Sequence, residues 1–182
     1  MQRINPLKHI TMNFGEAIKS VFSKYATFSG RARRSEFWYF FLLNFIICFV
    51  LGFIPFLSWV SGLWSLAILI PFVAVTVRRF HDTGKSGWYY LVPLIPALAY
   101  VGYLVYYVLK IMKEIGGSFS DADAIMQHIM DDPSGILAIV VLGLLTIITT
   151  IIWIVWMAKD SQPGENKWGP NPKEIQSQEN AW

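Results

Sequence analysis

Three long windows of this sequence contain no charged residue. They cover residues 37–77, 86–109 and 133–158, and together they make up half of the chain. Uncharged runs of about 20 residues or more are typical of helices that cross a membrane. The composition agrees, because only 15% of the residues are charged, against about 25% in soluble domains. The sequence therefore indicates an integral membrane protein.

The first window is too long for a single crossing. One helix of its 41 residues would measure about 61 Å, twice the roughly 30 Å hydrocarbon core of a bilayer. Two crossings joined by a turn near residues 58–62 fit instead, since Trp59 and Trp64 lie there and tryptophan favours the membrane–water interface. We therefore predict an all-α fold, an integral membrane four-helix bundle. Its spans are expected at about 37–58, 62–80, 86–109 and 135–158.

Two further helices are predicted outside the spans of this membrane domain, which covers residues 36–158. The cytoplasmic N-terminal segment 1–35 carries apolar residues at helical spacing, which predict an amphipathic helix: Phe14, Ile18, Val21, Phe22 and Tyr25. This helix could lie flat in the cytoplasmic interface of the bilayer or pack against the bundle. In the outer loop 110–134, Ala122, Ile125 and Ile129 share one helical face, so a short helix is expected there. The tail 159–182 shows no sustained periodicity.

The basic residues indicate how the chain is oriented. Of its 15 lysines and arginines, only Lys110 and Lys113 lie in the loop 110–134, and all the others flank the opposite ends of the spans. Segments rich in lysine and arginine stay in the cytoplasm. We therefore expect both termini, and the loop near residues 78–85, to be cytoplasmic.

Three polar motifs lie at the span ends that this topology places in the cytoplasm. They cover residues 30–38, 78–88 and 159–172. Their basic residues repel one another unless acids or anions intervene, so we predict direct ion pairs between the motifs, with Arg78 or Arg79 at the centre. The alternative is that the basic residues only fix the topology. The candidate binding face consists of Arg31, Arg33, Arg34, Glu36, Arg78, Arg79, His81, Asp82, Lys85, Trp88, Asp160, Glu165 and Asn166.

The three motifs also carry a family resemblance. The stretches Gly-Arg-Ala-Arg-Arg-Ser-Glu-Phe-Trp, Arg-Arg-Phe-His-Asp-Thr-Gly-Lys-Ser-Gly-Trp and Pro-Gly-Glu-Asn-Lys-Trp-Gly-Pro-Asn-Pro resemble the YhaH/YhaI-like bacterial inner-membrane proteins, a domain-of-unknown-function family. The resemblance covers roughly residues 12–172. It implies a bacterial inner membrane and about four spans, and it implies no activity.

The motifs offer little support for enzyme chemistry. Gly84-Lys85-Ser86 matches the end of a phosphate-binding loop, but Arg79 stands where that loop needs its first glycine. His81 and Asp82 are neighbours in the chain, and adjacent residues of a helix do not face one centre. Cys48 is the only cysteine, which excludes a disulfide or a cysteine-based zinc site within one chain. We therefore expect no catalytic residue, no metal site and no cofactor.

These patterns favour a non-enzymatic inner-membrane protein whose basic cytoplasmic face binds lipid headgroups or another membrane protein. The alternative is a subunit of a small transporter or channel, although the three windows lack the ionisable groups that ion and proton pathways usually place within spans. Expected partners are anionic membrane lipids, a membrane-protein partner or further copies of this chain. Nucleic acid is not expected, because the basic residues follow the edge of the bilayer.

The topology can be tested by cysteine labelling with a membrane-impermeant reagent, in a background with Cys48 replaced by serine. A cysteine at position 118, in the outer loop, should be labelled from outside the cell, and one at position 167, in the tail, should be labelled only after the membrane is opened. External labelling at position 167 would contradict the four-span topology, because a chain with three crossings exports its tail.

Overall fold

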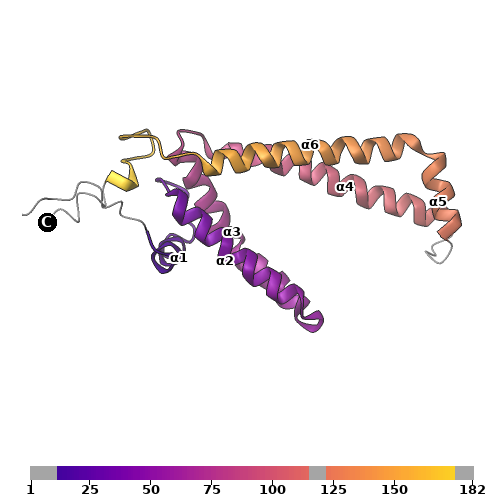
Figure 1. Ribbon diagram of the computed structural model, residues 1–182, viewed down its shortest axis with the longest axis horizontal. Helices are drawn as coiled ribbons and strands as arrows, with labels where there is room; N and C mark the ends of the chain where they lie inside the picture. The colour runs from indigo at the N-terminus through magenta and orange to yellow at the C-terminus, as the bar shows by residue number, and fades with distance from the viewer. Residues whose placement is uncertain (1–11, 115–121, 175–182) are drawn as a thin grey trace, which may run out of the picture. The chain divides into compact units, whose positions relative to one another are not determined.

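The computed structural model describes residues 12–114 and 122–174, and its regular structure there is helical, with no strand beyond an isolated bridge between Asn166 and Gly169. In chain order the elements are α1 (Phe14–Ser23), α2 (Arg34–Gly52), η1 (Pro55–Leu57), α3 (Ser58–Asp82), η2 (Gly87–Tyr90), α4 (Leu91–Glu114), α5 (Ala122–Asp131) and α6 (Pro133–Ala158) (Figure 1). By length and composition, α2, α3, α4 with the preceding η2, and α6 can each cross a membrane. The predicted all-α fold with four spanning helices is confirmed, and α5 is the short helix expected in the outer loop.

The connection between α2 and α3 lies earlier in the chain than the predicted 58–62. Helix α2 ends at Gly52, and α3 already begins at Ser58 after the short η1. Pro55 explains the shift, because proline cannot donate an N–H within a helix and also pushes the preceding residue out of the α region. Since α3 then continues to Asp82, the first half of the second polar motif is the last turn of a helix.

The chain forms two compact units, of which the first comprises residues 1–89 and 156–182 and the second residues 90–155. In the first unit, α2 and α3 form an antiparallel hairpin (Figure 1). The ring of Phe72 on α3 lies 6.2 Å from the ring centroid of Phe37 and 6.5 Å from that of Phe40, both on α2. Phe37 and Phe40 are fully buried, so these aromatic contacts form the core of the hairpin.

Helix α1 packs against this hairpin. Asn13 and Glu16 form a capping box, with Glu16 N donating to Asn13 Oδ1 at 2.8 Å and Asn13 N donating to a Glu16 carboxylate oxygen at 3.0 Å, which satisfies two N–H groups at the start of the helix. Ala17 and Val21 are completely buried, and the ring of Phe22 lies 5.7 Å from that of Phe40. The predicted amphipathic helix is therefore present and contacts the bundle, while its contact with the bilayer stays a prediction.

A hydroxyl group next to α1 completes the hydrogen bonding of α3. Pro71 lies inside α3 and has no N–H, so the carbonyl of Ala67, four residues earlier, loses its partner within the helix. The hydroxyl of Tyr25 donates a hydrogen bond to this carbonyl. An unpaired carbonyl away from water costs free energy. The Tyr25 hydroxyl therefore gives the carbonyl of Ala67 a hydrogen-bond partner, and it also fixes the position of α1 against α3.

The second unit contains α4, α5 and the greater part of α6. Asp132 precedes α6, and its Oδ1 accepts hydrogen bonds from Gly135 N at 2.9 Å and Ser134 Oγ at 2.7 Å, while Lys110 Nζ lies 2.6 Å from its Oδ2. The Lys110 ammonium, followed by these two donors, lowers the pKa of Asp132 well below its usual range. Two acids of the outer loop thus have internal partners, since His128 on α5 also lies 2.7 Å from Glu114. Residues 115–121 of the outer loop lie outside the described residues.

We expect Tyr25→Phe to lower the free energy of unfolding by about 1 kcal/mol, the usual net contribution of a hydrogen bond. Pro71→Ala restores an N–H that the carbonyl of Ala67 can accept within α3. In that background Tyr25→Phe should lower the free energy of unfolding by much less. Thermal unfolding in detergent of the original protein, both single variants and the double variant measures this coupling. Equal costs of Tyr25→Phe in the two backgrounds would contradict the assignment.

Candidate functional site

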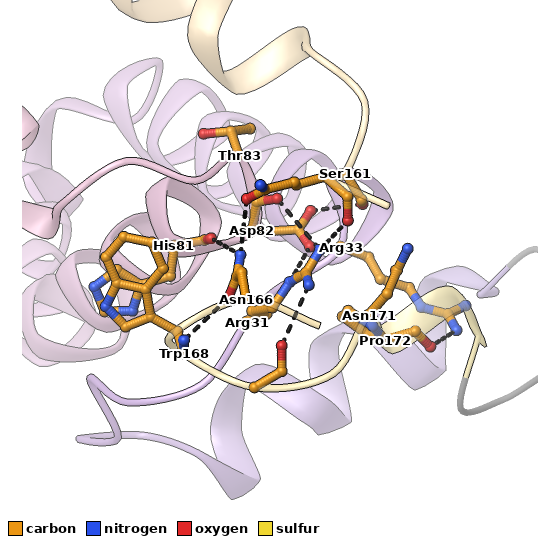
Figure 2. Close-up of polar contacts among 12 residues, drawn as sticks. Arg31, Arg33, His81, Asp82, Thr83, Ser161, Asn166, Trp168, Asn171 and Pro172 are labelled. Atoms are coloured by element: carbon orange, nitrogen blue, oxygen red, sulfur yellow. Dashed lines mark hydrogen bonds and ion pairs between the residues drawn. The ribbon is translucent and has the colours of Figure 1, made fainter. Parts of the chain in front are cut away.

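The carboxylate of Asp82, at the end of α3, lies at the centre of a buried polar network (Figure 2). Its Oδ1 accepts a hydrogen bond from Arg31 Nε at 3.0 Å, and its Oδ2 accepts from Arg79 and from Ser161 Oγ at 2.6 Å. The side chains of Arg31, Arg79 and Asp82 are at most 1% exposed. One acid therefore joins all three polar motifs, because Arg31, Arg79 and Ser161 belong to different ones.

Arg31 fixes the tail to the end of α3. Besides Asp82 Oδ1, its guanidinium donates to the carbonyls of Gln162 at 2.5 Å, Gly164 at 2.7 Å, Gly169 at 3.3 Å and Asp82 at 3.4 Å. Gly164 and Gly169 have φ values of +68° and +120°, where side-chain-bearing residues are strained. The two glycines thus let the tail curl so that its carbonyls face one arginine. No other cation could do this, because only arginine presents five N–H donors in a planar fork.

Two other arginines bind the end of α6. Arg79 donates through Nε to the carbonyl of Met157 at 3.1 Å, and through Nη2 to that of Lys159, while Arg34 donates to the carbonyl of Ala158 at 3.3 Å. The last carbonyls of a helix have no intrahelical donors. Positive charge there also opposes the negative end of the helix dipole, so these arginines stabilise the end of the fourth spanning helix.

Arg78 and Glu36 form a second buried pair. Arg78 Nη1 lies 2.8 Å from Glu36 Oε1, and the two side chains are 1% and 3% exposed. The backbone of the first motif is also tied here, since Ala32 N donates to the carbonyl of Arg78 at 3.0 Å. This pair joins the start of α2 to the end of α3.

His81 faces the tail and not Asp82. Its Nδ1 lies 3.1 Å from the carbonyl of Gly30, and because a carbonyl only accepts, Nδ1 carries the proton. The imidazole stacks on the indole of Trp168, with ring centroids 4.4 Å apart and planes inclined by 10°. Asn166 donates to the carbonyl of His81 at 3.0 Å and accepts from Trp168 N at 3.0 Å. Figure 2 shows the bonds of Asn166 with His81 and Trp168 beside the arginine network.

The predicted ion pairs between motifs are confirmed by Arg31 with Asp82 and Arg78 with Glu36. The prediction that Arg78 or Arg79 would be the centre is wrong, because one carboxylate accepts from two guanidinium groups at once and Asp82 does so. Arg33 is buried and donates to the carbonyl of Pro172. Burial lowers its pKa.

The remaining residues of the candidate binding face lie at the surface. Asp160 is 71% exposed, with Lys173 at 3.1 Å and Arg34 at 3.7 Å, and the hydrogen bond from Lys173 lowers its pKa. Glu165 is exposed. Arg34 and Asp160 belong to different motifs, so theirs is a third ion pair between motifs, although an exposed one. The sequence reasoning missed Ser161, Trp168 and the carbonyls of the tail.

Lys85 of the candidate face lies beside two aromatic rings. No carboxylate of the described residues lies within 4.0 Å of its ammonium, which sits 4.9 Å from the ring centroid of Tyr89 and 4.8 Å from that of Trp156. Trp88 next to it is 78% exposed. In the described parts of the chain, no three histidine, cysteine or acidic side chains form a group that could hold a metal ion. The geometry therefore offers Lys85 as a cation for an anionic ligand.

Comparison with known proteins supports the resemblance. The family model described as "Protein of unknown function (DUF805)" matches residues 25–118, just over half of the chain. "Inner membrane protein YhaH" of Escherichia coli (strain K12) is 38% identical over 94 residues, which cover 47% of this chain and 75% of that protein. "Inner membrane protein YhaI" of the same strain is 38% identical over 93 residues, which cover 48% and 79%. No solved structure matches the chain. The family match includes the first two motifs, whereas the third lies beyond residue 118.

We expect Asp82→Ala to destabilise the protein by about 3–5 kcal/mol, because it leaves Arg31 and Arg79 buried without their carboxylate. Asp160→Ala is the matched control, since its ion pairs are exposed and such pairs contribute roughly 0–1 kcal/mol. Thermal unfolding in detergent measures both, and trypsin cleavage after Lys159 or Lys167 reports release of the tail. An Asp82→Ala variant no less stable than Asp160→Ala would contradict the central role of Asp82.

Proposed function

The chain belongs to the DUF805 family, and from this premise we propose that it is a non-enzymatic inner-membrane protein that binds anionic lipid headgroups at its cytoplasmic edge. The two inner membrane proteins among its relatives support the location, and the distribution of lysine and arginine supports cytoplasmic termini. Binding of a membrane-protein partner through the same face is the alternative that the experiment below separates.

The observation that carries this proposal is the position of Lys85. It lies between two spanning helices, outside both, so we expect it at the depth of the phosphate groups. Two aromatic rings flank its ammonium, which limits its movement, and Trp88 is exposed beside it as tryptophans at the membrane interface are. Phosphate is the anion found at that depth, and a lysine near an anionic leaflet contributes about 1 kcal/mol to binding.

The buried network has a supporting role in this proposal. Each nitrogen of the Arg31 guanidinium already has an acceptor within the protein, and Arg79 is likewise occupied by Asp82 and two carbonyls. These arginines hold the span ends and the tail together. Of the cations in the motifs, Arg34, Lys159 and Lys167 are exposed and Lys85 is half-buried, and these are the ones that we propose for lipid phosphates.

The same contacts support a function other than catalysis. Both oxygens of Asp82 are taken by arginines, and one of them also by Ser161. His81 is engaged by the carbonyl of Gly30 and by Trp168. A general acid or base must reach the proton that it transfers, and the Asp82 carboxylate is enclosed by its three donors.

Lipid retention tests the proposal. The purified protein is titrated with phosphatidylglycerol or phosphatidylcholine and examined by native mass spectrometry. We expect preferential retention of phosphatidylglycerol. Lys85→Gln should weaken that preference about fivefold, which corresponds to the roughly 1 kcal/mol of one cation at the leaflet.

Lys173→Gln is the matched control, because Lys173 already pairs with Asp160 and its loss should leave the preference unchanged. Equal retention by the Lys85→Gln variant and the original protein would overturn the proposal. Retention of a co-purified protein that depends on Lys85, without a preference for phosphatidylglycerol, would point to the membrane-protein partner.

A further inference from the structure

We infer that the groove between α2 and α3 is a contact surface for a second copy of this chain, a role that does not depend on the lipid site. The groove is apolar, has a volume of about 290 Å³, and lies within the two spanning helices. Phe41, Asn44, Phe45 and Cys48 of α2 line one wall, and the other consists of Ser65, Ile68, Leu69 and Phe72 of α3.

Asn44 makes this groove unlike an ordinary lipid-facing surface. The residue is 7% exposed, its Nδ2 donates to the carbonyl of Phe40 at 2.7 Å, and its Oδ1 has no hydrogen-bond partner. An unpaired acceptor in hydrocarbon costs several kcal/mol. Acyl chains of lipids cannot donate a hydrogen bond, so the occupant that satisfies Asn44 must bring a donor to this depth.

Helix α1 does not cover the groove. Its neighbour Tyr25 reaches the carbonyl of Ala67, and Ala67 lies about 150° around α3 from the middle of the groove wall at 100° per residue. The contact of α1 with α2 is made at Phe40 and Tyr39, and neither lines the groove. Within the first unit, one side of the hairpin is therefore covered and the groove side is open.

The hairpin carries a ridge beside the groove that a second copy could use. Phe45, Phe49 and Phe53 are 58%, 56% and 71% exposed, and their rings follow one another at 5.9 Å and 4.7 Å. In a two-fold symmetric contact the same surface serves both copies, so the ridge of each copy can enter the groove of the other.

The carboxamide of Asn44 suits such a contact because it is self-complementary. One N–H of its Nδ2 and its Oδ1 remain to be paired, and two such groups can each donate to the other across a two-fold axis. The oxygen is recessed, so the carboxamide must turn about χ2, a torsion with a broad range. The turn exchanges the hydrogen bond from Nδ2 to the carbonyl of Phe40 for the bonds across the axis, and that carbonyl keeps its acceptor role in the backbone ladder of α2. A second copy thus supplies the missing donor and the aromatic side chains that fill the groove.

Cys48, the only cysteine, provides the first test, by oxidative cross-linking in native membranes with a lipid-soluble copper catalyst. We expect a disulfide-linked dimer through Cys48, and through a single cysteine at position 45 in a Cys48→Ser background. A single cysteine at position 50 is the control, because Val50 is 52% exposed but lies on the far side of α2, about 170° from the groove. Equal cross-linking at positions 48 and 50 would show random collision, and no dimer at positions 45 and 48 would mean that a lipid or another helix fills the groove. Either result overturns the inference.

Asn44→Leu provides the second test and separates association from folding. Energy transfer between labelled copies in vesicles should show a dimer weakened about eightfold, as expected for the loss of two symmetry-related hydrogen bonds between membrane helices. The thermal stability of the monomer in detergent should not fall, because the substitution removes an unpaired buried acceptor. A dimer unchanged by Asn44→Leu, or weakened only in proportion to a loss of monomer stability, would overturn the role of Asn44.

Discussion

The carboxylate of Asp82, held between the guanidinium groups of Arg31 and Arg79, is the interaction on which the first unit of this protein depends. Removing a charge from water costs several kcal/mol, and the attraction of a partner offsets this only when the remaining hydrogen-bonding capacity is also used. Here both the acid and the arginines meet that condition. The hydroxyl of Ser161 donates a further hydrogen bond to the Asp82 carboxylate, and backbone carbonyls accept from the remaining N–H groups of Arg31 and Arg79. The groups involved come from the start of α2, the end of α3 and the end of α6. Loss of one side chain of this network therefore frees segments that lie far apart in the sequence.

Backbone carbonyls do much of the work that acids were expected to do. Arg31, Arg33, Arg78 and Arg79 are all buried, whereas Glu36 and Asp82 are the only buried acids among the residues that the structure describes. The carbonyls of residues 157–172 supply the balance, as partial negative charges aimed at Arg31, Arg33 and Arg79. The tail can surround the arginines in this way because glycines at positions 164 and 169 allow positive φ. Asp160 and Glu165 consequently stay at the surface, where water solvates them.

The sequence predicted the spanning helices because hydropathy over some 20 residues is a strong signal that depends on no tertiary contact. The sequence also predicted that the three motifs lie together, since the number of membrane crossings decides which helix ends share a side of the membrane. It failed where the partner was a main-chain atom: no side chain identifies the carbonyls that bind Arg31, or the carbonyl of Ala67 that accepts from Tyr25. The turn at Pro55 was visible as a proline, but the nearby tryptophans outweighed it, although backbone chemistry is the stricter constraint. Asn44 could be recognised as polar within a span, whereas its unpaired oxygen needed coordinates.

Burial divides the basic residues of the motifs into two roles. Arg31 and Arg79 are closed to solvent, so dissolved ions screen their pairs little, whereas charges at the surface are screened over a Debye length of about 8 Å at physiological ionic strength. Lys85 belongs to the second group, and a ligand held by it competes with salt. A motif rich in arginine therefore need not be a binding site for anions, because the guanidinium nitrogens of Arg31 and Arg79 already donate to acceptors of their own chain. In the function that we propose, lipid binding falls to the few cations that the network leaves outside, and the network contributes by fixing where they are.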